Sequence, residues 1–486
     1  MKTKLFKIYF MATIGMALFF TLGCEKDDPV EFAGGIGTGA EPYLIETPKQ
    51  LDAVRHNLNK HFKQIADIDL SGYSSGEGWQ SIGYENDPFT GTYDGDGYKI
   101  TNLTINYKSK SPWIGLFGYT DNSTIKNLGL ELINVSVQLG RAGGLVGENR
   151  GNIINCYATG EVSSPGSQGV GGLVYWNDGN ITNSYAAVNV SGAWVVGGLV
   201  GTNYDNGEIT DCYATGDASA TGTTVGGLVG GNDGNITNCF ATGDVSGNED
   251  VGGLVGVNYR GNIKDSYVTG DVSGSKYVGG LVGWSWDYIT NCNATGNVSG
   301  GDIVGGLVGG FQGGHLTNCY ATGIVLGNNV VGGLVGVNVN SNIINSFATG
   351  DVSGENQVGG LAGLNTEEGN ITNCYATGDV AGEDRIGGLV GSNGEQYYEG
   401  FIKNSYATGV VSGNNDVGGL VGEYLSGNIE YSYYDKETTG QDDTGKGIPK
   451  TIAEMMQQST FETWDFTNIW KINEGIGYPY LRWQVG

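Results

Sequence analysis

The sequence is poor in histidine, in proline and in positive charge. Its three histidines, His56, His61 and His315, form no His-Glu-x-x-His motif, which excludes that type of zinc protease. Only 8 prolines are present, so the chain is neither collagen-like nor a proline-rich linker. Lys and Arg number 24 against 51 Asp and Glu, a formal charge of −27. Because phosphate contacts need Lys and Arg, this balance excludes direct nucleic-acid binding.

Glycine is what the chain has in excess. It makes up 89 of 486 residues, about 18% against a usual value near 7%. Hydrophobic residues reach 39%, with 28 Tyr and 9 Trp, which is too rich for a disordered chain. This composition predicts short β-strands joined by many tight turns.

The first 24 residues have the pattern of a bacterial lipoprotein signal peptide. Basic residues precede an apolar run at 8–22, which is shorter than the roughly 20 residues that a membrane span needs. The run ends in Gly23-Cys24, which resembles a lipobox, so Cys24 is the predicted lipidation site and its partner is outer-membrane lipid. An ordinary secretory signal is the alternative.

The residues after Cys24 predict exposure at the cell surface. Glu25-Lys26-Asp27-Asp28 is similar to the export signal of surface lipoproteins in Bacteroidetes. Residues 25–41 contain four glycines and are predicted to be a flexible tether. A lipid anchor followed by a tether holds the folded part close to a membrane but outside it.

A Gly-Gly-Leu-Val-Gly unit recurs through most of the chain. Its first glycine lies at 143, 171, 197, 226, 252, 279, 305, 332, 359, 387 and 418, so 275 residues over ten intervals give a mean period of 27.5. A unit of this size cannot bury a core alone, so neighbouring units must stack. We therefore predict an all-β fold, a parallel β-solenoid of about eleven coils over residues 115–435, each with three short strands and three corners. Right-handed coiling is expected by analogy with parallel crossovers.

Equivalent positions should form columns along such a solenoid. Columns that include Leu145 and Ile153 should point inward, and the corner column that includes Asn149 should use left-handed backbone angles and lateral amide bonds. One column is aromatic in ten of eleven units and should stack along one wall. Its members are Tyr157, Tyr185, Tyr213, Phe240, Tyr267, Asn293, Tyr320, Phe347, Tyr375, Tyr406 and Tyr433.

The repeat resembles the GLUG motif, here Gly144-Leu145-Val146-Gly147 and its ten successors. The family occurs in bacterial surface proteins, among them adhesin-like proteins and IgA-specific metalloproteases. The resemblance implies an extracellular repeat architecture but no particular activity, and the protease function does not carry over because the zinc motif is missing.

Both ends should carry caps. Residues 42–114 are predicted to be an N-terminal cap with the first coils, including a helix at 48–60 that starts at Thr47-Pro48. Residues 436–486 are predicted to be an aromatic C-terminal cap with a short helix at 449–459. Its seven aromatic residues after Ser459 should form a hydrophobic plug.

No catalytic or metal-ligating constellation stands out, and no cofactor is predicted. A column of acids is expected to be a solvated face, with Ca²⁺ binding as the alternative and paired catalytic carboxylates as a further one. Its members are Glu161, Asp217, Asp244, Asp271, Asp351 and Asp379. Six cysteines share another column with serines, which predicts a small buried residue. Cys212 with Cys239, and Cys292 with Cys319, lie in adjacent coils, so disulfides remain an alternative to thiols.

Aromatic residues near the corners are the candidate ligand-binding groups, because exposed rings stack on sugars. They are Trp176, Tyr204, Tyr259, Trp284, Trp286 and Tyr288. Trp176 and Trp284 share a column with Thr202 and Gly231, so packing there does not require a large ring. We therefore expect a surface-anchored adhesion module that binds a glycan or a host-surface ligand. A polysaccharide-active β-helix enzyme and a structural spacer are the alternatives.

Overall fold

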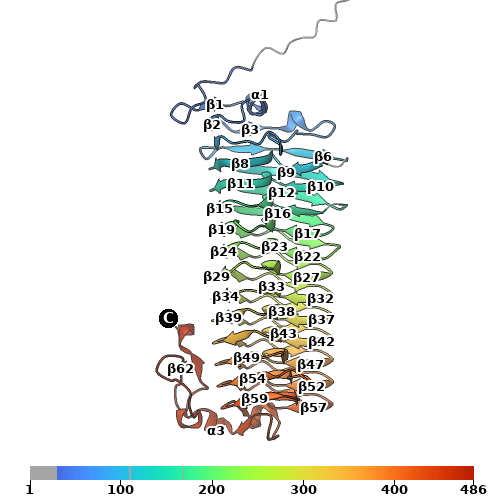
Figure 1. Cartoon of the computed structure of the whole chain (residues 1–486), viewed down its shortest axis with the longest axis vertical. Coiled ribbons are helices and arrows are strands. Elements are labelled where there is room, and N and C mark those ends of the chain that lie inside the picture. The colour runs from blue at the N-terminus through green and yellow to red at the C-terminus, as the bar shows by residue number, and fades with distance from the viewer. Residues whose placement is uncertain (1–29, 109–110, 167, 486) are drawn as a thin grey trace, which may run out of the picture. The chain divides into compact units, whose positions relative to one another are not determined.

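A computed structural model describes residues 30–108, 111–166 and 168–485. Cys24, with the rest of the predicted signal peptide and the first part of the tether, lies outside the described residues. Residues 32–486 form one compact unit, in which parallel β-coils stack along a single axis (Figure 1). No helix among the described residues has the length and apolarity to cross a bilayer.

Most coils contribute five short strands to three parallel sheets. In one central coil these are β27 (Glu249–Gly252) in a first sheet, β28 (Val255–Asn258) and β29 (Ile263–Lys264) in a second, and β30 (Tyr267–Val268) and β31 (Val272–Ser273) in a third. Each strand pairs in parallel with its equivalent in the next coil. The predicted solenoid is confirmed. Three strands per coil is correct for the first complete repeat, β10 (Gly140–Gly143), β11 (Val146–Ile154) and β12 (Tyr157–Ser164), and wrong for the later coils, in most of which two of the three sides are each divided into two strands.

The number of coils is larger than predicted, about 14 rather than eleven. The additional turns lie before the first complete repeat, where β1 (Tyr43–Ile45), β2 (His61–Gln64) and β4 (Thr92–Asp94) pair in series with β8 (Phe117–Lys126). Residues 42–114 were predicted to contain first coils, but these turns lack the Gly-Gly-Leu-Val-Gly unit, so the repeat did not give their number.

The predicted inward columns form the core. Leu145, Ile153 and their equivalents are fully buried. The last glycine of each motif unit lets the second sheet approach the first sheet closely. A Cβ on Gly283 would lie 2.6 Å from the carbonyl carbon of Asp250 and 2.7 Å from the amide nitrogen of Val251. The glycine column therefore exists because two backbones touch there, which leaves no space for a side chain.

Two different asparagine columns shape the coil. The corner column that includes Asn149 and Asn177 is buried, and its side chains bond from coil to coil, as with the Asn149 Nδ2–Asn177 Oδ1 bond of 2.8 Å. These residues do not have positive φ, so the expected left-handed corner was wrong at this column. Left-handed residues form two other columns: one lies two positions before the aromatic column, as at Asn155 with φ of 53°, and one lies in the first sheet, as at Tyr277 with φ of 53°.

At the N-terminal end the helix is shorter than expected, and the folded unit begins earlier than expected. Helix α1 (Pro48–Ala53) begins with a capping box between Thr47 and Gln50 and continues as a 3₁₀ turn, η1 (Val54–His56). The predicted helix at 48–60 stops there because residues 61–64 join the sheet as β2. Residues 32–41 were predicted to be tether, yet Phe32 stacks on Tyr43 at 4.3 Å and belongs to the folded unit.

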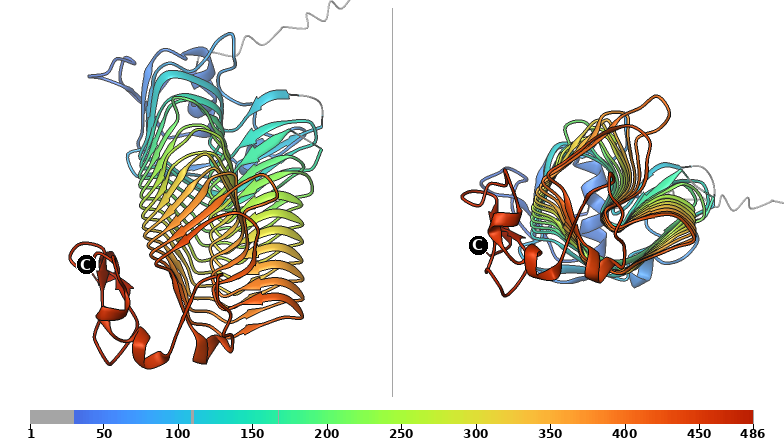
Figure 2. Two further views of the ribbon diagram at one scale, coloured as in Figure 1. Left: turned by 60° about the horizontal axis from the view of Figure 1, so that its bottom comes forward. Right: turned by 90° about the horizontal axis from the view of Figure 1, so that it is seen from below.

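The C-terminal segment closes the last coil and then folds back along its side (Figure 2). After β60 (Tyr433–Asp435) and α2 (Lys436–Thr439), β61 (Ile448–Lys450) extends the third sheet by one strand. The predicted helix at 449–459 appears as α3 (Ile452–Met455) and η3 (Gln458–Thr460). The chain then runs along the aromatic wall, where the Trp483 ring lies 5.8 Å from Phe347. The aromatic cluster is thus a side cover, whereas we expected an end plug.

Candidate ligand-binding surfaces

The residue after each corner position, which is Asn258 in one coil and Ser285 in the next, is held outward by the backbone. The amide of Tyr259 donates to the carbonyl of Asn232 in the preceding coil at 2.8 Å, and that of Trp286 donates to Asn258 at 3.0 Å. The buried corner asparagines hold this geometry, so side chains at these positions are presented at the coil spacing. Any functional group here is therefore positioned by regular sheet structure.

Four aromatic residues from adjacent coils form what we call the central aromatic patch: Tyr259, Tyr277, Trp284 and Trp286. The rings of Tyr259 and Trp286 lie parallel within 6°, with centroids 5.5 Å apart, and their residues are 48% and 40% exposed. Trp284 lies 5.6 Å from Trp286 at an angle of 50°. Two inclined aromatic surfaces therefore meet at the corner.

Trp284 is more deeply packed than the sequence suggested. It is half-buried, meets Tyr277 edge-on at 4.7 Å, and its indole nitrogen is buried without a hydrogen-bond partner. A Cβ on Gly310 in the next coil would lie 2.1 Å from the Trp284 ring. The ring thus has a packing role that depends on this glycine, while Tyr259 and Trp286 remain the accessible members.

Polar groups border the central aromatic patch. Trp286 Nε1 donates to Gln312 Oε1 at 3.2 Å, and the Lys276 ammonium lies 4.4 Å from the centre of the Tyr277 ring. Burial, with a contribution from Glu249, raises the pKa of Asp250 to about 6. Aromatic surface beside amide, ammonium and carboxyl groups is suited to ligands with both apolar faces and hydroxyls.

The other predicted residues lie elsewhere. Trp176 contacts Tyr204 at 4.9 Å in a second cluster nearer the N-terminus, and Tyr288 stacks on His315 at 5.1 Å. The six candidates are therefore not one site. The second cluster also contains Trp113 and Tyr175, with Arg141 lying 4.8 Å above the Trp113 ring.

Sequence reasoning missed Trp113, Tyr175 and Tyr277. Tyr175 carried a readable signal, because it replaces the last glycine of its Gly-Gly-Leu-Val-Gly unit. Glycines at 169 and 201 make room for it: a Cβ on Gly169 would lie 2.3 Å from the Tyr175 ring, and one on Gly201 would lie 2.6 Å from it. Tyr277 lies in the first sheet, and nothing in the repeat indicates that it meets Trp284.

The acidic column has a structural use that the sequence did not reveal. The backbone amide of Asp244 donates to Asp217 Oδ1 at 3.0 Å, and that of Asp271 donates to Asp244 Oδ1 at 3.0 Å. Asn189 and Asn297 accept the same bond in their coils. Among the described residues, no group of three or more His, Cys, Asp or Glu is arranged to hold a metal ion.

The cysteine column is explained by the same type of bond. Cys239 Sγ accepts the amide of Cys212 at 3.4 Å and donates to the carbonyl of Thr237 at 3.2 Å. Ser184 makes the equivalent pair of bonds with its hydroxyl, which is why Ser and Cys interchange. The thiols are free and buried, and burial raises the pKa of Cys374 to about 12.

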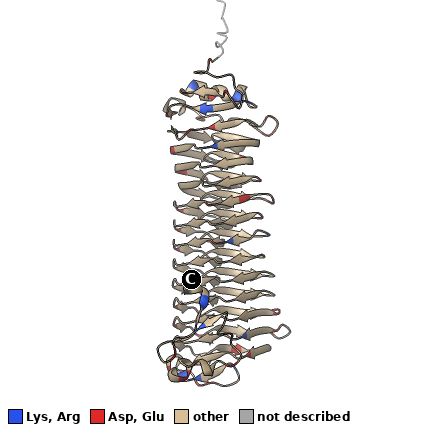
Figure 3. Ribbon diagram, turned by 90° about the vertical axis from the view of Figure 1, so that its left-hand side faces the viewer, with Lys and Arg blue, Asp and Glu red and all other residues tan. Residues whose placement is uncertain are grey.

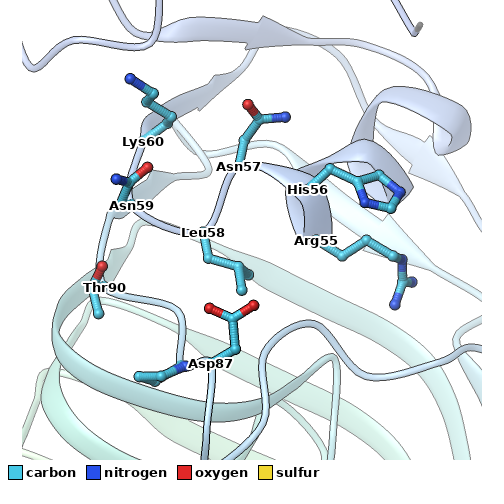
Figure 4. Close-up of a pocket in the computed structure, with 9 residues that line it drawn as sticks. Arg55, His56, Asn57, Leu58, Asn59, Lys60, Asp87 and Thr90 are labelled. Carbon is cyan, nitrogen blue, oxygen red and sulfur yellow. The ribbon is translucent and has the colours of Figure 1, made fainter.

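A hollow of about 640 Å³ lies beside η1, lined by Arg55, His56, Lys60 and Asp87 among others (Figure 4). Arg55 is bound to the carboxylate of Asp52 and to the carbonyl of Gln80, and Figure 4 shows the Lys60 side chain pointing away from Asp87. These side chains do not converge on a common point, so they form no catalytic arrangement.

Comparison with known proteins gives the motif and distant relatives. The GLUG motif matches residues 139–163, 192–219, 221–246, 247–273, 274–299, 327–353 and 354–381. A protein called a Gly-rich membrane protein in Evansella cellulosilytica is 41% identical over 146 residues, covering 29% of this chain and 17% of that protein. Halomucin from Haloquadratum walsbyi is 36% identical over 142 residues, covering 26% of this chain and 2% of halomucin.

Two solved structures match most of this chain, but only at low structural similarity. A crystal structure described as a candidate immunoglobulin A1 protease from Bacteroides ovatus covers 93% of this chain and 95% of its own, at 20% identity and a TM-score of 0.29. A structure named IgA1 protease covers 88% of this chain and 24% of its own, at 14% identity and a TM-score of 0.20. TM-scores this low carry no argument about function.

Proposed function

Since this chain is a GLUG-motif repeat protein, we propose that it is a surface-anchored extracellular lipoprotein whose solenoid binds a glycan without catalysis. The observation that carries the proposal is the central aromatic patch, where exposed Tyr259 and Trp286 rings lie parallel beside Gln312 and Lys276. Sugar rings present C–H faces that pack on aromatic rings and hydroxyls that bond to amide and charged groups. A glycan is the ligand class with this chemistry, and a glycan of a host surface is the one that we propose.

The membrane anchor is part of the same proposal. Supporting it are the Gly23-Cys24 junction after a 15-residue apolar run and the Gly-rich membrane protein among the relatives. Thioether-linked lipid at Cys24 would hold the solenoid at the outer membrane, exposed at the cell surface. Cys24→Ala should release the full chain from the membrane fraction of a detergent-free lysate. Retention of this variant in the membranes would mean that the anchor lies elsewhere.

The binding proposal is tested on a glycan array with the full chain. Tyr259→Ala together with Trp286→Ala should weaken retention of the best-bound glycan about tenfold, since both stacking surfaces are lost. Tyr397→Ala removes a ring that is 83% exposed but lies outside the patch, and should bind as the unmodified chain does. The melting temperature of each variant is measured alongside. Unchanged binding with a lowered melting temperature would assign these rings to packing.

A further inference from the structure

The aromatic wall consists of two halves, each with five rings. The N-terminal wall is Tyr157, Tyr185, Tyr213, Phe240 and Tyr267, with neighbouring centroids 4.7–5.0 Å apart. The C-terminal wall is Tyr320, Phe347, Tyr375, Tyr406 and Tyr433, and its first four rings are 4.8–5.1 Å apart. Asn293 separates the two halves.

Only the C-terminal wall is covered. Residues 451–485 lie along it, and Figure 1 shows this segment, with β62 (Trp470–Lys471), beside the last coils only. Under the segment Tyr406 is 2% exposed and Tyr433 is 3% exposed, whereas Tyr267 on the N-terminal wall is 39% exposed. The other four rings of the N-terminal wall are half-buried, so the column is core under the covering segment and partly exposed beyond it.

The covering segment shows how a polypeptide binds this wall. Trp470 lies 6.1 Å from the Tyr406 ring and 6.3 Å from Tyr375, so its indole packs across the edges of the stacked rings. Backbone and side-chain bonds then fix the segment: Trp483 Nε1 donates to the carbonyl of Asn345 at 3.0 Å, and the Tyr406 hydroxyl donates to the carbonyl of Pro479 at 2.7 Å.

The charges beside the two halves differ. Residues 451–485 carry four acids and two bases, and the left-handed column next to the C-terminal wall has neutral asparagines at 318, 345, 373 and 404. Next to the N-terminal wall that column contains Asp211 and Asp265, the latter 3.5 Å from Lys264. On its other side the acidic column contributes four acids, Glu161, Asp217, Asp244 and Asp271, against two beside the C-terminal wall, Asp351 and Asp379. Figure 3 shows how sparse Lys and Arg are along the coils.

We propose that the N-terminal wall is a second binding surface, for an extended polypeptide segment of another protein that carries Trp or Tyr together with Lys or Arg. The rings continue a surface that already binds a Trp-rich segment, which accounts for the aromatic side chains. The flanking carboxylates attract cationic side chains, which accounts for the basic ones. A second copy of this chain, with its charge of −27, would be repelled.

The test measures binding of two synthetic peptides to the full chain by fluorescence anisotropy. In one peptide Trp alternates with Lys, and in its counterpart Trp alternates with Glu. The Lys peptide should bind with an affinity that falls as salt rises, and the Glu peptide should bind at least about tenfold more weakly. Equal binding of both peptides, or no binding of either, would overturn the proposal.

Variants then locate the binding. Tyr213→Ser with Phe240→Ser should abolish peptide binding. Asp211→Asn, Asp217→Asn and Asp244→Asn together keep every ring and every acceptor oxygen, because asparagine occupies these columns in other coils, and should weaken binding about tenfold. Tyr259→Ala with Trp286→Ala should leave peptide binding unchanged, which separates this surface from the glycan patch. Loss of binding in that variant, or its persistence in both wall variants, would refute the assignment.

Discussion

The buried corner asparagines should contribute to stability according to how completely each is hydrogen-bonded. Asn232 lies inside a continuous run: its Nδ2 donates to Asn258 Oδ1 at 2.7 Å and to the carbonyl of Gly234 at 2.7 Å, and its Oδ1 accepts from Asn203 at 2.9 Å. Asn338 begins the second run, because Phe311 occupies the preceding coil, and its Oδ1 has no partner. Both residues are fully buried.

These geometries give different costs for the same change. Asn232→Ala breaks three bonds and leaves buried partners unpaired, which should lower the free energy of unfolding by about 4 kcal/mol. Asn338→Ala breaks two bonds, to Asn365 and Ser341, and removes an acceptor that was already unpaired, so about 2 kcal/mol is expected. The cavity created is similar in both variants, so the difference of about 2 kcal/mol reports on the hydrogen bonds.

Urea unfolding of the full chain, followed by circular dichroism, measures the difference. Native-state hydrogen exchange in the adjacent coils accompanies it, because repeat proteins can unfold in parts. Equal destabilisation by the two alanines would refute the reasoning, since it would mean that the volume of the side chain matters and its bonding does not.

Three further results are expected from thermal unfolding of the full chain. The pKa of Asp250 is raised from 3.8 to about 6, so above pH 6 the folded protein must hold a half-buried carboxylate that is unfavourable there. Asp250→Asn removes this charge and should raise the free energy of unfolding by about 1 kcal/mol at pH 7.5, after allowance for solvent screening. At pH 4 the carboxyl is protonated in the folded protein, so the variant should have no effect. A gain that is independent of pH would contradict this. Gly283→Ala should cost about 3 kcal/mol or more, because its Cβ would meet backbone on two sides, whereas Gly72→Ala, with nothing within 4 Å, should be neutral. Similar costs for the two glycines would show that the contact can relax. Cys239→Ser should change stability by less than about 1 kcal/mol, because serine makes the same bonds in other coils; a larger loss would mean that sulfur volume matters.

The sequence by itself determined the fold class and most of its columns. A 27-residue period is too short for an independent core, so stacking was required, and stacking forces equivalent residues into contact. The Leu and Ile columns, the aromatic wall and the interchange of Ser with Cys followed from that requirement. The number of turns did not follow, because β1, β2 and β4 carry different residues on the same backbone path.

Only the tertiary structure decided what lies between coils and across corners. Register fixes which positions share a column, but it does not reveal that Tyr277 from the first sheet meets Trp284 from the second, or that Gly310 makes room for that indole. The C-terminal segment has no repeat, so its path along the aromatic wall depended on long-range packing that no local pattern encodes. For the same physical reason the six rings predicted from the sequence do not form one site: the fold gathers three of them into the central aromatic patch and leaves the N-terminal wall uncovered by the C-terminal segment.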